Sequence, residues 1–326
     1  MERRESITLL GGAAATWSLA ARAQQLERIR RVGVLMGIAN DSDASARAVA
    51  LQEAMRVLGW TIGRNIQIDY SFASGDAERM RTYAKELVSS APDVIIAVTN
   101  PALQAVLDAT RSQPIVFLQV SDPVGGGFVE SLDHPGGNIT GFTNFEPEVG
   151  SKWLQILKEI APGVERAGFL FNPETSAHVG FLRAVETASV TLAVKVSPLG
   201  VRKVSEIESA ITEFALTPEG GLIIAPHPLT IGNLIIDLAA KYRLPAIYPF
   251  AFHARDGGLV SYGIDQVDQW RSAATYVDRV LRGTKPANLP VQQPTKYELV
   301  INLKTAKELK LTVPPNLLTL ASQVIE

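Results

Sequence analysis

The sequence predicts an α/β protein with two Rossmann-like domains, each built on a parallel sheet, joined by a hinge of three chain crossings. Short apolar runs alternate with helical patterns along most of the 326 residues, the order that gives parallel sheets covered on both faces. A glycine-rich stretch, Ser121 to Phe145, interrupts this alternation, which then begins again. A chain of this length can bury two separate cores.

The first unit begins with the buried run Arg31 to Gly37, a strand closed by glycine. A helical pattern follows from Ser45 and ends at Gly59, a good C-terminal stop. Alternation of apolar and polar residues from Asn65 to Ser71 indicates a strand near a sheet edge. The remaining elements expected in this unit are a helix over 76–90, a central strand over 93–98, a helix from Pro101 to Arg111 and a strand over 114–120.

The stretch Ser121 to Phe145 (SDPVGGGFVESLDHPGGNITGFTNF) is expected to carry the chain from the first unit to the second. Its glycines permit backbone angles that side chains forbid, while Pro135 fixes its own φ. Such a segment suits a crossing whose two ends keep defined directions, so it is interpreted as the first crossing of the hinge.

The same alternation of strands and helices is repeated in the second unit. Strands are expected over 166–171, 193–196, 221–225 and 245–248, and helices over 149–160, 176–190, 204–214 and 231–242. A strand over 258–263 then leads to an amphipathic helix over 267–281, which we expect to pack back on the first unit. A strand over 296–303 would return to the second unit and precede a short helix over 304–309.

Three crossings in this order predict the limits of the domains. The N-terminal lobe would contain residues 30–143 and 265–292, and the C-terminal lobe residues 144–264 and 293–326. Residues 1–25 stand apart, because Arg3 and Arg4 precede a short apolar run that ends in Ala21-Arg22-Ala23. This is the pattern of a secretory signal peptide cleaved after about Ala23, and the paired arginines favour the twin-arginine route. Ser6 departs from that motif, so the general secretory route stays open, as does a surface helix.

Composition excludes several classes of function. A formal net charge of −2 with dispersed basic residues gives no reason to expect nucleic acid as a partner. Cysteine is absent, which excludes a thiol nucleophile, a thiolate metal site and disulfides. The four histidines show no metal-ligand spacing, and no nucleophile elbow or phosphate loop occurs. No catalytic residue, metal or cofactor is therefore expected.

In a parallel sheet the ligand crevice lies beyond the carboxyl ends of the strands, and the residues expected there are mostly neutral hydrogen-bonding groups. The candidate ligand-binding residues are Asn40, Ser42, Thr99, Asn100, Ser121, Asp122, Asn144, Asn172, His227, Tyr248, Tyr262 and Asp265. Such a set can hold a small polar solute, with helix N-termini offering N–H groups to a carboxylate. Structural alternatives remain: N-capping for Ser42, Thr99 and Asn100, a turn for Asp122, and core packing for the tyrosines.

Several segments resemble a known family. They are RRESITLLGGAAA near the N-terminus, LGWTIGRNIQIDYSFASGD at 58–76, PDVIIAVTNPA at 92–102, SDPVGGGFVESLDHPGGNITG at 121–141 and YELVINLKTAKELKL at 297–311. On these segments the chain resembles the type I periplasmic solute-binding proteins of ABC importers, in the group that includes tryptophan-binding members. The resemblance implies a periplasmic monomer whose two lobes close on a solute, which is then delivered to a membrane permease.

Carried over to this sequence, the family's pocket loops match Ser42, Thr99, Asn100, Ser121, Asp122, Asn172, His227 and Asp265. For an amino-acid ligand, the resemblance implies that hydroxyls and backbone N–H groups hold the carboxylate, and that Asp122 or Asp265 holds the ammonium. The expected function is capture of a small organic solute, an aromatic or branched amino acid or a related carboxylate. The alternatives are a ligand-sensing domain for a membrane receptor or regulator, and an enzyme that uses the cleft.

Overall fold

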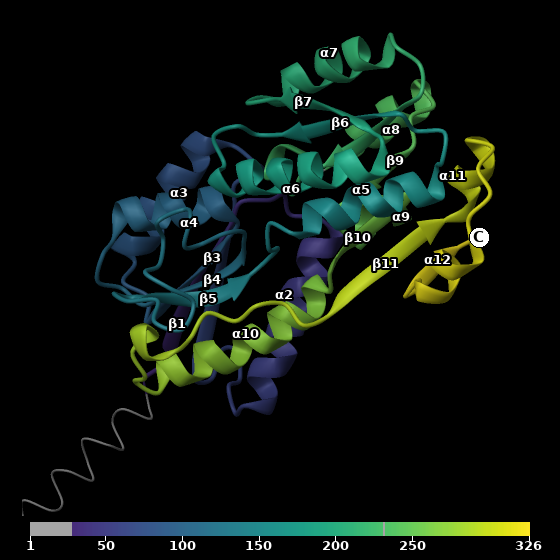
Figure 1. Cartoon of the computed structure of the whole chain (residues 1–326). Helices are drawn as coiled ribbons and strands as arrows, with labels where there is room; N and C mark the ends of the chain where they lie inside the picture. The colour runs from purple at the N-terminus through teal and green to yellow at the C-terminus, as the bar shows by residue number, and fades with distance from the viewer. Residues whose placement is uncertain (1–27, 231) are drawn as a thin grey trace, which may run out of the picture.

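The computed structural model describes residues 28–230 and 232–326 and contains two separate β-sheets that lie side by side (Figure 1). The first sheet has the order β2-β1-β3-β4-β5, and all its neighbouring strands are parallel. Its strands are β1 (Arg30–Met36), β2 (Ile66–Phe72), β3 (Val94–Val98), β4 (Ile115–Val120) and β5 (Ile139–Thr143). The predicted signal peptide, residues 1–25, and its cleavage position lie outside the described residues.

Helices cover both faces of the first sheet. The pair α2 (Ser42–Val57) and α10 (Gln266–Leu281) packs on one face, and α3 (Ala77–Ser89) and α4 (Asn100–Ala109) on the other (Figure 1). Trp270 of α10 is fully buried in the core of the first face. The prediction that this late helix packs back on the first unit is therefore confirmed.

The second sheet has the order β12-β11-β10-β9-β8-β6-β7, with β10 and β11 antiparallel and the other neighbours parallel. Its strands are β6 (Arg166–Phe171), β7 (Lys195–Gly200), β8 (Gly220–Ile224), β9 (Ala246–Tyr248), β10 (Val260–Ile264), β11 (Tyr297–Asn302) and β12 (Gln323–Ile325). The fold class predicted from the sequence, two α/β domains on parallel-sheet cores, is confirmed.

Helices also enclose the second sheet. One core contains Trp153 and Phe181 from α5 (Val149–Ile160) and α6 (Ser176–Leu192), and the other contains residues of α7 (Val204–Ala215) and α8 (Leu234–Lys241). The shorter helices are α9 (Ala251–Arg255), α11 (Leu303–Glu308), α12 (Pro315–Leu320) and the 3-10 turns η1 (Pro228–Thr230) and η2 (Pro286–Asn288). Within the described residues, no helix combines the length and apolar character needed to cross a membrane.

The chain passes between the two sheets three times, and the first passage is shorter than the stretch 121–145 that was interpreted as the first crossing. The glycine-rich part of 121–138 joins β4 to its parallel neighbour β5, so it belongs entirely to the first sheet. The chain leaves that sheet only at Asn144. The second passage lies between β10 and α10, and the third precedes β11.

Hydrogen bonds tie the three passages to one another. Thr143 N–H donates to Gln292 O at 2.8 Å, and Gln269 Nε2 donates to Thr143 O at 2.7 Å. Asp265 N–H donates to Lys296 O at 3.3 Å. Hydrogen bonds thus connect the three segments of chain that join the lobes.

Several predicted elements have different limits in the structure, among them α2, which begins at Ser42 and not at Ser45. Strand β7 begins at Lys195, not at 193, because Ala193 takes the left-handed C-cap of α6 with φ of 51°. Helix α8 begins at Leu234, whereas the predicted helix began at Ile231, which lies outside the described residues. Helices α9 and α12 and strand β12 were not predicted, because each is too short to show a period.

Gly263 in β10 allows a close backbone approach beside the second passage. A Cβ built on Gly263 would stand 1.7 Å from Pro249 O, whereas one on Gly163 would meet nothing within 4 Å. We therefore predict that Gly263→Ala lowers the free energy of unfolding by about 2 kcal/mol or more, because the backbone has to shift. The matched variant Gly163→Ala should stay within about 0.5 kcal/mol of wild type. Equal urea midpoints for the two variants would contradict this packing.

Candidate functional site

Loops at the carboxyl ends of strands from both sheets enclose two adjoining cavities, of about 520 and about 20 Å³, the first of which falls in the range of small-molecule sites, about 300 to 1,000 Å³. The narrower one, which Arg47 lines, is called the interlobe cavity. The lobes approach closely beside it, since a Cβ on Gly75 of the first lobe would lie 3.6 Å from Pro228 of the second. The cavity is therefore an interlobe site with walls from both domains.

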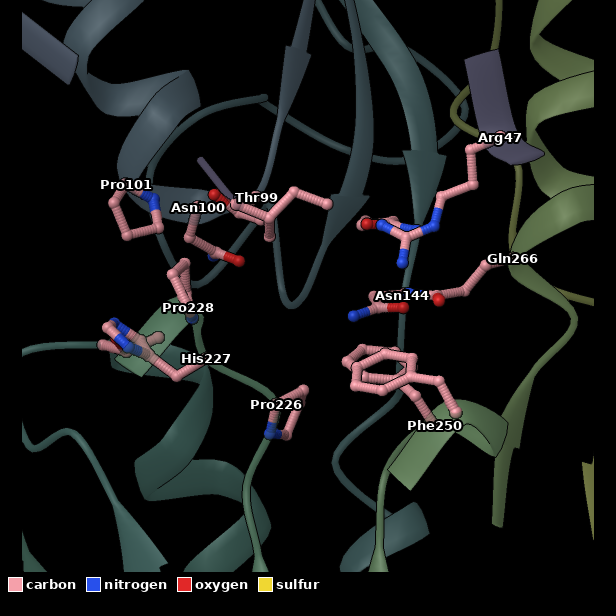
Figure 2. A pocket seen from close by; sticks show the side chains of 14 residues that line it. Arg47, Thr99, Asn100, Pro101, Asn144, Pro226, His227, Pro228, Phe250 and Gln266 are labelled. Atoms are coloured by element: carbon pink, nitrogen blue, oxygen red, sulfur yellow. The ribbon is translucent and has the colours of Figure 1, made fainter. Parts of the chain in front are cut away.

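Arg47 is the charged residue among the described residues that line this cavity. It lies on the buried face of α2 with Ala44 and Leu51, and only 3% of it is exposed. Figure 2 shows its guanidinium turned toward Asn144 and Gln266. No ion pair or hydrogen bond joins this guanidinium to another described residue. Burial lowers the pKa of Arg47, although Asp43 and Asp41 oppose that effect.

Three further polar side chains of the cavity have a buried atom without a hydrogen-bond partner among the described residues. These atoms are Thr99 Oγ1, Gln119 Nε2 and Asn144 Oδ1. Leaving such groups unpaired costs about 1–3 kcal/mol each, so native proteins seldom do so without a reason. A ligand that hydrogen-bonds to all three would satisfy them.

Backbone strain occurs at the same place. Thr99 has φ of 87° and ψ of 155°, a region that a β-branched residue rarely enters, and Gln119 has φ of 55°. Thr99 occupies the N-cap position of α4 without accepting a capping hydrogen bond. A Cβ on Gly37 would stand 2.3 Å from Thr99 Oγ1, so glycine there leaves room for this hydroxyl.

Asn100 fixes the strand ends on the first-lobe side. Its Nδ2 donates to Ser121 O at 2.8 Å, and its Oδ1 accepts from Ser121 N–H at 3.0 Å. This pair of bonds ties the end of β3 to the end of β4. Asn100 therefore has a positioning role in the cavity wall, distinct from the N-cap alternative.

His227 lines the cavity from the second lobe, and its ring is neutral. Its Nδ1 accepts from Leu229 N–H at 3.1 Å, so the neutral ring carries its proton on Nε2. Burial, with a smaller contribution from His178, lowers the pKa of His227 to about 3. The Nε2 atom lies 3.4 Å from Asn172 Nδ2. His227 also lines a neighbouring, wider cavity, which shares Asn100 with the first. Asn172 lines this wider cavity as well.

Apart from Thr175 and Gln266, the rest of the cavity wall is apolar. Phe250 and Phe252 stack with ring centroids 5.7 Å apart beside the buried His253. The other apolar lining residues are Ile38, Pro101, Pro226 and Pro228. Figure 2 shows the Phe250 ring below the Arg47 guanidinium, so an aromatic surface and a cation face the same space.

The structure brings four of the predicted site residues to this cavity and Asn172 to its neighbour. Thr99, Asn100, Asn144 and His227 line the first. Asn40 and Ser42 are exposed, and the N-cap of α2 is Asp41, whose side chain accepts from Ala44 N–H at 2.7 Å. Neither Asn40 nor Ser42 lines the cavity.

Ser121 and Asp122 form the start of the glycine-rich loop. Ser121 is held through its backbone by Asn100, and Asp122 accepts from Gly125 N–H at 2.8 Å in a turn with φ of 45°. Neither residue lines the interlobe cavity, so the turn alternative accounts for Asp122.

The remaining three predicted residues have structural roles away from the cavity. Tyr248 is buried against His253, at a centroid distance of 5.1 Å, and Tyr262 stacks on Tyr297 at 5.6 Å. Asp265 caps α10 and pairs with Lys296 Nζ at 2.6 Å. Burial alone would raise the pKa of Asp265, but the bonds from Lys296 and Asp268 N–H outweigh it and lower that pKa. This carboxylate therefore already has a partner.

Arg47 and Gln119 were missed in the sequence. Arg47 stands three residues after Ala44 and four before Leu51, so helical spacing places an arginine on an apolar stripe. A charged residue at such a position is the signal that could have identified it. Gln119 gives no comparable signal in the sequence. Its backbone is left-handed within β4, and no glycine marks that position. Among the described residues, no group of His, Cys, Asp or Glu is arranged to hold a metal ion.

Comparisons with known proteins agree with this geometry. A family model described as ABC transporter substrate binding protein matches residues 31–325. A tyrosine-binding protein of Clostridioides difficile (strain R20291) is 27% identical over 263 residues, which cover 79% of this chain and 74% of that protein.

Two solved structures have a TM-score of 0.84 and cover 91% of this chain and 100% of their own. One is a conserved domain protein of Vibrio cholerae, 26% identical, and the other an ABC domain from Streptococcus pneumonia in complex with L-Trp, 25% identical.

The buried histidines predict acid sensitivity. Burial lowers the pKa of His178 and His253 to about 4, and that of His227 to about 3, from 6.5. The unfolded chain therefore binds more protons below about pH 6.5, and the free energy of unfolding falls as pH decreases toward 4. At pH 5 each buried histidine should cost roughly 2 kcal/mol relative to pH 7.5.

Urea unfolding at pH 7.5 and 5.0 measures this loss. His253→Gln should reduce the difference between the two values by roughly 2 kcal/mol, because it removes one titrating group. The control His134→Gln alters an exposed histidine and should leave the difference unchanged. Identical pH dependence in wild type and His253→Gln would contradict burial of a neutral ring.

Proposed function

The chain belongs to the ABC transporter substrate binding protein family, and on this premise we propose that it is the solute-capturing component of an ABC importer. Closure of the two lobes around the solute is the whole of its proposed activity. Binding energy selects the closed form, which a membrane permease then recognises. No chemical step is proposed.

We propose that the solute carries a carboxylate next to an aromatic or branched apolar group. The observation that carries this proposal is the buried Arg47 guanidinium, which faces the interlobe cavity without a partner among the described residues. A guanidinium binds a carboxylate through two parallel hydrogen bonds. Phe250 and Phe252 offer a surface for the apolar group. Relatives named for tyrosine and L-Trp support an aromatic amino acid or a related carboxylate.

The proposed binding residues are those that line the cavity from both lobes. Thr99, Gln119 and Asn144 would hydrogen-bond to the solute, and His227 Nε2–H would donate to it. The proposed lobes are residues 30–143 with 265–292, and 144–264 with 293–326. Opening would separate Thr99 and Arg47 on one lobe from His227 and Phe250 on the other.

The proposed setting is the periplasm. Residues 1–25 would direct export as a signal peptide and be removed by cleavage after about Ala23, and the mature protein would act as a monomer without a cofactor. Genes for a membrane permease and an ATPase beside the gene for this chain would support the importer role. Their absence together with a receptor gene would favour a sensor.

We predict that a thermal-shift screen of aromatic and branched amino acids and carboxylates finds at least one solute that raises Tm. Arg47→Met should abolish that shift, because the carboxylate loses its charge-assisted hydrogen bonds. The same variant should unfold at an equal or higher temperature without solute, since it removes a buried charge that lacks a partner.

Arg56→Met provides the matched control, because Arg56 is an exposed arginine of the same helix. It should keep the full solute-induced shift. A shift retained in Arg47→Met would remove this residue from the site, and no shift with any carboxylate would overturn the proposed solute class.

A further inference from the structure

We infer that the cavity selects a monocarboxylate that lacks a charged ammonium group, such as an aromatic propionate, over the amino acid with the same ring. This inference rests on the proposed function and narrows its solute class. It follows from the set of charges that face the cavity.

The interlobe cavity has a cation but no anion among its described lining residues. Arg47 is the charged group, and none of the other lining residues is aspartate or glutamate. His227 is neutral at physiological pH because burial disfavours its charged form. A bound carboxylate would therefore complete the charge balance, and a zwitterion would bring in a second cation.

The acidic side chains that act on Arg47 do not line the cavity. Asp43 and Asp41, at the start of α2, both oppose the lowering of the Arg47 pKa, and Asp41 caps the helix through Ala44 N–H. Glu174 and Asp108 line the neighbouring cavity, where both are exposed; Glu174 pairs with Arg202 at 3.2 Å, and Asp108 accepts from Gln104. An α-ammonium held beside Arg47 would lose water without gaining an ionic partner.

The geometry of an amino acid places its ammonium close to the same guanidinium. The ammonium and the carboxylate share one carbon, so a carboxylate bound to Arg47 leaves the ammonium within the range of about 4–6 Å where like charges repel. Asn144 Oδ1 is a buried acceptor without a partner among the described residues, and it can take a neutral O–H or N–H. A neutral ring N–H, as in indole-3-propionate, satisfies it without a charge.

The test is a titration of refolded, solute-free protein with matched compounds that share one ring. Indole-3-propionate, tryptophan and tryptamine form one series; 3-phenylpropionate, phenylalanine and phenethylamine form the other. The propionate should bind at least tenfold more tightly than the amino acid, and the amine should not bind. Tighter binding of the amino acid would overturn the inference and leave the proposed function standing. Binding of neither acid would overturn both.

A variant with an added carboxylate tests whether the lack of an anion in the cavity causes this selectivity. Asn144→Asp places a carboxylate in the cavity, so the ratio of propionate affinity to amino-acid affinity should fall at least tenfold. Asn288→Asp is the matched control, because Asn288 is exposed and does not line the cavity. Its ratio should equal that of wild type. An unchanged ratio in folded Asn144→Asp would overturn the charge argument, and circular dichroism establishes that each variant is folded.

Discussion

The central constraint on this molecule is the buried positive charge of Arg47, which has no ion-pair or hydrogen-bond partner among the described residues. Arg47 is on a helix of the first sheet, Asn144 lies at the first passage, where its N–H donates to Val120 O, and Phe250 follows β9 of the second sheet. In the proposed function, closing the lobes would remove water from the guanidinium, which is unfavourable unless an anion takes its place. A carboxylate would therefore stabilise the closed form more than the open form. That difference in affinity is the condition for a ligand to shift a conformational equilibrium.

The strand ends of the first lobe are built for the same purpose. Thr99 and Gln119 hold left-handed backbone angles that cost energy, and each keeps a buried polar atom without a partner among the described residues. Asn100 ties the two strand ends together, and Gly37 leaves space for the Thr99 hydroxyl. The local structure is thus less stable than capped and relaxed loops would be. The strained backbone and the buried polar atoms thus lie at the cavity, where a bound solute can compensate their unfavourable free energy.

The sequence was sufficient to predict the fold and the family, type I periplasmic solute-binding proteins. The spacing of apolar residues and the glycines at the ends of elements are local features of the sequence that indicate burial. Helix α5 and strand β6 were therefore predicted with their observed limits. Fewer of the site residues could be predicted from the sequence. Residue type and strand-end position identified Thr99 and Asn144, but Tyr248 and Asp265 share those features and lie elsewhere. Which side chain faces the cleft depends on how the two lobes pack. The only sign of Arg47 in the sequence is that an arginine occupies an apolar face of a predicted helix.

The three passages would form the hinge of the proposed closure. The passages at Thr143, Asp265 and Gln292 are joined by backbone and side-chain hydrogen bonds, so they would bend together. Each lobe has its own buried core, and the cavity residues lie on strand ends or helix starts that those cores hold in place. Rotation about the hinge then changes distances between the lobes and preserves those within each. In the proposed rotation Asn100 would keep Thr99 and Ser121 in register. The distance between Arg47 and Phe250 would change, and with it the exposure of the guanidinium to water.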